Sequence, residues 1–99
     1  MLDSIHLKSI ISAGEGYNAE FKVNLPSNLK GITEEVCAFA NASGGVVLIG
    51  VDDKNVIKGV TLDNSKRSSI QNSLGEISPP LSCEFYMVEF EGKSVAVIE

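Results

Sequence analysis

Residues 35–53 read EVCAFANASGGVVLIGVDD, and this stretch decides the predicted fold. Residues 46–51 are apolar without alternation, which is typical of a central strand covered on both faces. Ahead of them, apolar residues recur at helical spacing, so residues 31–42 are predicted to form a helix. Gly44 is well placed as the left-handed residue that ends this helix. The middle of the chain is therefore predicted to be a helix that turns tightly into a buried strand.

The remaining segments extend this unit in both directions along the chain. Apolar residues at three- and four-residue intervals predict helices over residues 1–13 and 63–77. Strands are predicted over residues 19–23, 56–60, 83–90 and 93–98, the second as a partner of the central strand and the last two as a hairpin. The predicted order is α-β-α-β-β-α-β-β, an α+β domain with a small mixed sheet covered by helices.

Length and composition indicate one small globular domain. The chain has 99 residues, of which 43% are hydrophobic and 21% charged, which is ordinary for a folded domain. The longest apolar run, residues 46–51, falls far short of the ~20 residues of a membrane span. The first residues lack the basic start and cleavage site of a signal peptide. Cys37 and Cys83 stand among apolar residues, so they are predicted to be reduced thiols of a cytoplasmic protein.

The net charge of −5 argues against a nucleic-acid binder, which is usually basic. The charge is uneven, however. Residues 1–67 hold seven basic and eight acidic residues, whereas residues 68–99 hold one and five. A basic face in the first two thirds is therefore compatible with the composition. The candidates for phosphate contacts are Lys22, Lys54, Lys58, Lys66 and Arg67, and a solvated surface is the alternative for each of them.

Three short motifs occur in a fixed order. They are EGYNAEFK at residues 15–22, AFANASGG at residues 38–45 and GVDD at residues 50–53. Together they resemble the Schlafen AlbA-like domain, a family also described as a proposed DNA-binding domain of bacterial transcriptional regulators. The resemblance covers residues 15–99 and implies a compact α/β fold that binds nucleic acid, DNA in preference to RNA. It also implies that residues 1–99 are a single domain at the N-terminal side of a longer protein, with a homodimer as a reasonable assembly.

The same resemblance names a candidate catalytic site. In animal members the domain is linked to RNA cleavage by three carboxylates, of which two match Glu15 and Glu20 and the third is Asp52 or Asp53. Such a set would hold Mg²⁺ or Mn²⁺, which prefer oxygen ligands. Lys22 shares a strand face with Glu20 and would neutralise phosphate charge beside the metal. If the domain is a nuclease, Glu15, Glu20, Lys22 and Asp52 are its catalytic residues and the three carboxylates its metal ligands. The zinc-binding residues of animal members have no counterpart here.

Simpler structural roles compete with this interpretation. Glu20 and Lys22 would form a polar pair on a half-exposed strand, and Asp52 would bond its own backbone in a hairpin turn. Three functions therefore stay open: a non-catalytic nucleic-acid-binding module of a regulator, which the resemblance favours; a metal-dependent endoribonuclease; and a protein-interaction or dimerisation domain that uses an exposed hairpin edge. Tyr17 and Tyr86 are the aromatic residues that could stack on bases.

Overall fold

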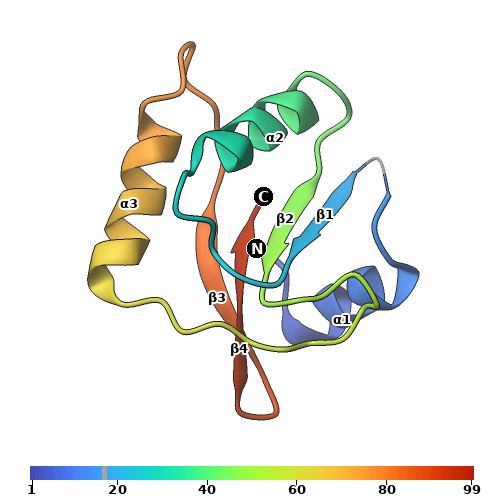
Figure 1. Ribbon diagram of the computed structural model, residues 1–99. Helices are drawn as coiled ribbons and strands as arrows, with labels where there is room; N and C mark the ends of the chain where they lie inside the picture. The colour runs from blue at the N-terminus through green and yellow to red at the C-terminus, as the bar shows by residue number, and fades with distance from the viewer. Residues whose placement is uncertain (17) are drawn as a thin grey trace.

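The sheet has four strands in the order β1-β2-β4-β3, and three helices cover it (Figure 1). The computed structural model describes residues 1–16 and 18–99. Along the chain the elements are α1 (Ser4–Ala13), β1 (Ala19–Lys22), α2 (Lys30–Ala40), β2 (Val46–Ile49), α3 (Asn64–Gly75), β3 (Phe85–Phe90) and β4 (Lys93–Ile98). The α+β class, the mixed sheet and all three helices are as predicted. In the described part of the chain, no helix has the length and hydrophobicity needed to cross a membrane.

β2 is the central strand that its unbroken apolar run predicts. It pairs in parallel with β1 and antiparallel with β4, so that Lys22 lies opposite Ile49 and Val97 opposite Leu48. All four residues of β2 are buried. Because successive side chains of a strand point to opposite faces, β2 contributes to two separate apolar layers.

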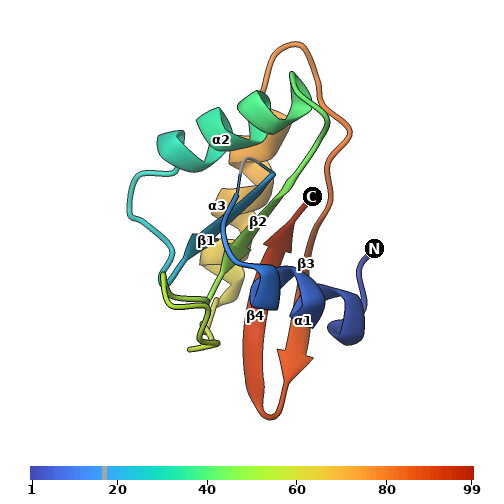
Figure 2. The same cartoon turned by 90° about the vertical axis from the view of Figure 1, so that its right-hand side faces the viewer.

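The two layers lie on opposite faces of the sheet. α1 covers one face and α2 and α3 cover the other, as Figures 1 and 2 show together. On the α1 side, the packed side chains include Leu7, Ile11, Phe21, Leu48 and Val97. On the α2–α3 side, they include Ile32, Val36, Val47, Ile49, Ile70, Leu74 and Ile98. Cys37 and Cys83 are free thiols at half-buried positions.

Side-chain caps and positive backbone angles set the element ends. α1 begins at Ser4, later than predicted, because the Asp3 side chain accepts a hydrogen bond from the N–H of His6. Gly44, with φ of 91°, lies in the turn between α2 and β2. The β3–β4 turn has φ of 48° at Glu91 and 82° at Gly92, and two positive angles are what a two-residue type I′ hairpin requires.

The predicted strand over residues 56–60 does not form. Both edges of β2 are already taken, by β1 and by β4, so a returning segment has no free edge of β2 along which to pair. Only an isolated bridge joins Val51 to Ile57. The N–H groups of the two residues after Ile57 both donate to the carbonyl of Gly50, at 2.8 and 2.9 Å. Residues 50–63 therefore form a loop that passes across the end of the sheet, and the order is α-β-α-β-α-β-β.

The α2–β2 connection should tolerate little added volume at Gly45. A Cβ atom at Gly45 would lie 2.6 Å from Cγ of Phe39 and 2.8 Å from the backbone oxygen of Asn18. We expect Gly45→Ala to lower the free energy of unfolding by about 2 kcal/mol, since overpacking displaces backbone. Gly31→Ala is the matched control, because a Cβ there meets nothing within 4 Å. Urea denaturation should show Gly31→Ala to be neutral or stabilising by up to about 1 kcal/mol, and equal losses in both variants would contradict this account.

Candidate functional site

The outer edge of β1 is closed by the residues that precede it. The carbonyl of Lys22 accepts hydrogen bonds from the β2 side, so the alternate residues Ala19 and Phe21 direct their backbone groups outward. Ala19 exchanges two hydrogen bonds with Gly16, at 3.2 and 3.3 Å. Oε2 of Glu15 accepts a hydrogen bond from the N–H of Phe21 at 3.1 Å. The Glu15 carboxylate thus pairs with an outward backbone N–H of β1, and this hydrogen bond holds the carboxylate beside the strand.

Three carboxylates and one ammonium group meet on the α2-facing side of β1. Ala19 and Phe21 pack toward α1, so Glu20 and Lys22 face α2. Nζ of Lys22 lies 2.9 Å from Oε1 of Glu35, a residue of α2. Burial, the nearby Glu35 and Glu15 carboxylates and a hydrogen bond with Glu15 raise the pKa of Glu20, against the opposing effect of Lys22.

We call Glu15, Glu20, Lys22 and Glu35 the Glu20 cluster. With all four groups ionised, it has two more negative than positive charges. Its one lysine is already paired with a carboxylate, so the cluster as a whole repels phosphate. Lys22 is thus placed beside Glu20, as its strand position predicts, but its partner is a carboxylate of this chain. Glu35 belongs to the cluster although no strand periodicity pointed to it.

The side chain of Asp52 makes its hydrogen bonds within the loop that follows β2. Its Oδ1 accepts hydrogen bonds from the N–H groups of Lys54 and Val56, both at 2.9 Å, and its Oδ2 lies 4.0 Å from Nζ of Lys58. The hydrogen bond from Val56 is the main cause that lowers the pKa of Asp52. Glu20 lies opposite Val47 in the sheet register, whereas Asp52 follows the end of β2. The structure therefore brings Glu15 and Glu20 together but leaves Asp52 outside their cluster.

A resident metal ion does not fit the side chains as they are arranged. Among residues 1–16 and 18–99, no three His, Cys, Asp or Glu side chains are grouped so that they could hold a metal ion. Oε2 of Glu15 already accepts the N–H of Phe21, and Oε1 of Glu35 already pairs with the ammonium of Lys22. The Glu15–Glu20–Asp52 metal site that the sequence suggested is thus not assembled in this structure.

Basic side chains gather around the loop of residues 50–63 instead. Figure 1 shows this loop running from the end of β2, across the end of the sheet, to the start of α3. Its own lysines are Lys54 and Lys58, and α3 adds Lys66 and Arg67 in its first turn; all four are exposed. Nε of Arg67 donates to the carbonyl of Leu62 at 3.1 Å, which ties this side chain to the loop.

Two further lysines border the same loop although they are distant in sequence. Nζ of Lys93 donates to the carbonyl of Ile57 at 3.4 Å. Lys8 of α1 lines a cavity of about 180 Å³ together with Ile57 and Lys93. No pattern in the sequence predicted this proximity, because it depends on how α1 and the β3–β4 hairpin pack. We call the exposed Lys8, Lys54, Lys58, Lys66, Arg67 and Lys93 the basic loop surface.

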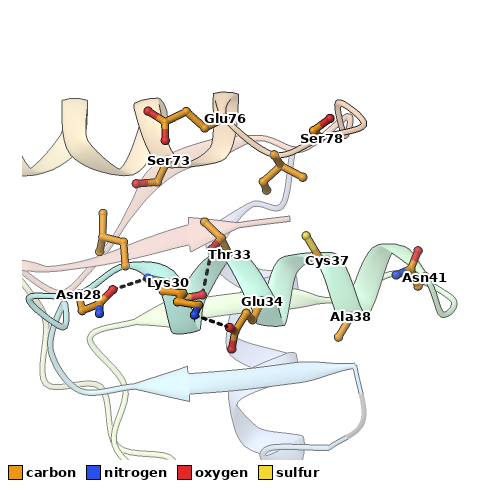
Figure 3. A pocket seen from close by; sticks show the side chains of 12 residues that line it. Asn28, Lys30, Thr33, Glu34, Cys37, Ala38, Asn41, Ser73, Glu76 and Ser78 are labelled. Atoms are coloured by element: carbon orange, nitrogen blue, oxygen red, sulfur yellow. Dashed lines mark hydrogen bonds and ion pairs between the residues drawn. The ribbon is translucent and has the colours of Figure 1, made fainter.

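A large groove lies elsewhere, between α2 and α3 (Figure 3). It measures about 740 Å³ and is lined by side chains that include Asn28, Lys30, Thr33 and Glu34. Nζ of Lys30 lies 4.0 Å from Oε1 of Glu34, so the lysine in this groove faces a carboxylate. None of the residues that the sequence named as catalytic or phosphate-binding lines it.

Tyr86, one of the two tyrosines that the sequence offered for base stacking, is engaged in hydrogen bonds within the chain. Tyr17 lies outside the described residues. The hydroxyl of Tyr86 donates to Oε1 of Glu99 at 2.6 Å and accepts from the N–H of Leu2 at 2.8 Å. Burial and the Glu99 carboxylate raise the pKa of Tyr86 to about 12. Tyr86 therefore fastens the N-terminal segment to the end of the chain.

The three motifs lie in different parts of the fold. The motif at residues 15–22 includes β1, the motif at residues 38–45 includes the α2–β2 turn, and the motif at residues 50–53 begins the loop of residues 50–63. A family model for Schlafen, AlbA_2 matches residues 15–99, the range that the motifs indicated. The chain belongs to the Schlafen AlbA_2 family.

Two solved structures are similar to this AlbA_2 domain. One is the solution NMR structure of the N-terminal domain of a protein from Nitrosomonas europaea that is named as related to the ATP-dependent DNA helicase RecG. It is 22% identical, covers 99% of this chain and 72% of its own, and has a TM-score of 0.67. The other is the crystal structure of the DIP2311 protein from Corynebacterium diphtheriae, 21% identical, with a TM-score of 0.59. It covers 95% of this chain, which spans 24% of that protein. At these identities the two structures show a shared fold.

The Glu20 cluster predicts a pH-dependent stability. Because the pKa of Glu20 is raised above its ordinary value of 4.5, the folded chain holds this proton more tightly than the unfolded chain. The free energy of unfolding therefore falls as pH rises through the interval between these two pKa values. We expect Glu20→Gln to raise the unfolding midpoint at neutral pH, and the gain to disappear well below pH 4.5.

Thermal or urea unfolding of both proteins across this pH range measures the effect. Glu34→Gln is the matched control, because Glu34 is exposed and has only the 4.0 Å contact with Lys30. A gain in Glu34→Gln equal to that in Glu20→Gln, or a gain independent of pH, would contradict the arrangement of the cluster.

Proposed function

We propose that this AlbA_2 domain is a non-catalytic nucleic-acid-binding module that contacts phosphates through the basic loop surface. The observation that carries the proposal is the gathering of six of the eight lysine and arginine residues around one loop. Membership of the family supports it, as does the likeness to a protein named as related to a DNA helicase. DNA is the proposed ligand, and the regulatory role proposed is that of the DNA-contacting part of a transcriptional regulator.

The chemistry of the surface suits phosphate in particular. Arginine and lysine neutralise phosphate charge, and the bound counterions that they release favour association. The first turn of α3 does not supply free backbone donors at every position, because Oδ1 of Asp63 accepts the N–H of Lys66 at 2.8 Å. The side chains of Lys66 and Arg67, more than the helix end itself, would therefore carry this part of the contact.

Local charge also argues for this surface over the Glu20 cluster. Lys58 is 55% exposed in its side chain and lies 4.0 Å from its nearest carboxylate, whereas Lys22 is 24% exposed and 2.9 Å from its partner. Releasing Lys22 for a phosphate would leave three carboxylates unopposed. The proposed interface therefore includes Lys54 and Lys58 and leaves Lys22 out.

Fluorescence anisotropy of a labelled DNA duplex, measured over a series of salt concentrations, tests the proposal. Each phosphate contact adds about 0.9 to the slope of log affinity against log salt. We expect the double variant Lys54→Ala/Lys58→Ala to reduce this slope by about 2 and to weaken binding at every duplex sequence. Single-stranded RNA, measured in parallel, distinguishes the two nucleic acids.

Lys30→Ala is the matched control, since it removes one exposed charge that faces Glu34 and borders a different groove. It should leave the slope unchanged. Absence of binding at low salt, or equal losses in Lys30→Ala and the double variant, would overturn the proposal. A signal that decays with time only when Mn²⁺ is added would instead indicate cleavage and contradict a non-catalytic module.

A further inference from the structure

The outer edge of β3 offers backbone groups that no other segment uses. Glu84 and Glu99 exchange two hydrogen bonds, at 2.8 and 3.0 Å, so residues 84, 86, 88 and 90 direct their backbone groups toward β4. The alternate residues Phe85, Met87 and Glu89 direct theirs away from the sheet. Among residues 1–16 and 18–99, no hydrogen bond reaches these outward N–H and C=O groups. The edge of β3 is thus open, whereas Gly16 and Glu15 close the edge of β1.

A groove runs beside this open edge on the face covered by α3. It measures about 290 Å³ and is lined by Phe85 of β3, by Gln71, Leu74 and Gly75 of α3, and by Leu81 and Cys83. An extended chain that paired with β3 would direct every second side chain to this face of the sheet. The groove therefore gives such side chains a partly apolar surface to contact, formed by Leu74, Leu81 and Phe85.

The charge along the edge specifies what kind of strand it can accept. Residues 84–91 read EFYMVEFE and contain three glutamates and no lysine or arginine. Glu84, Glu89 and Glu91 are all exposed. The nearest lysine in sequence, Lys93, contacts the carbonyl of Ile57 on the neighbouring loop. A strand with basic side chains would find opposite charges here, and a strand with acidic side chains would find like charges.

We propose that β3 binds an extended, basic segment of a partner protein, which adds to the sheet as a further strand. The backbone of the segment pairs with the outward groups of Phe85, Met87 and Glu89. Its apolar side chains enter the groove beside α3, and its lysine or arginine side chains, which point to the opposite face of the sheet, contact Glu84 on the side of Tyr86 and Val88. Self-pairing of two β3 strands would bring two acidic edges together without a single basic residue from either strand, and the glutamates oppose it.

The test is an NMR titration of the isotope-labelled 99-residue chain with a short synthetic peptide of alternating lysine and valine. We expect the amide protons of Phe85, Met87 and Glu89 to exchange with solvent at least about tenfold more slowly when the peptide is bound. Those of Tyr86 and Val88, already bonded to β4, should change little. A peptide of alternating glutamate and valine has the same strand propensity and should not bind.

Two variants locate the contact. Glu84→Lys should weaken binding about tenfold or more, the scale of one interfacial charge contact, whereas Glu34→Lys makes the same charge change on α2 and should leave binding unchanged. Met87→Pro removes an outward N–H that β4 does not use, and it should abolish protection at the edge.

Three results would overturn the proposal. One is equal binding of the basic and acidic peptides, and another is peptide binding without protection of the three outward amides. The third is protection that rises with protein concentration in the free chain, which would make a second copy the occupant of the edge. Nucleic-acid binding by the basic loop surface is measured separately, so either proposal can fail without the other.

Discussion

β2 is hydrogen-bonded on both edges and buried on both faces, and this double constraint shapes the rest of the molecule. Apolar surface buried on both faces contributes roughly 25 cal/mol per Å², so both helical layers depend on this strand. Because β1 and β4 occupy the two edges of β2, the segment that follows β2 cannot turn back and pair with it as a further strand. Residues 50–63 instead pass across the end of the sheet. This path places the lysines of the basic loop surface there.

The two outer edges of the sheet, at β1 and at β3, are protected from pairing with another strand in different ways. At β1, the Glu15 carboxylate accepts the outward N–H of Phe21, and Gly16 exchanges two backbone hydrogen bonds with Ala19. Glu15 therefore accepts a backbone hydrogen bond at the edge of β1, a structural role that the family motif does not indicate. At β3, protection comes from charge, because glutamates at an edge discourage association with another acidic strand. Closing an edge by hydrogen bonds excludes every partner, whereas protecting it by charge excludes only partners of the same sign.

Patterns within one segment were sufficient to predict most of the fold. The unbroken apolar run of residues 46–51 predicted the central strand, Asp63 predicted the start of α3, and Glu91-Gly92 predicted the hairpin turn. The strand expected at residues 56–60 failed because pairing depends on which edges remain free, and a local pattern does not record that. For the same reason the sequence placed Lys22 beside Glu20 but not Glu35 beside Lys22, since that contact joins a strand to a helix.

Net charge and local surface charge can differ in this molecule for a physical reason. The molecule extends 36 × 30 × 22 Å, several times the screening length of about 8 Å at physiological salt. A phosphate at the basic loop surface therefore responds to the lysines around residues 50–63 more than to the total of −5. Three aspartates lie in the same region: Asp52 and Asp63 accept backbone hydrogen bonds, which partly offset their negative potential, and Asp53 is exposed to solvent. The chain can thus be acidic as a whole and still carry a local group of basic side chains around this loop, while Glu84, Glu89 and Glu91 give the β3 edge the opposite charge.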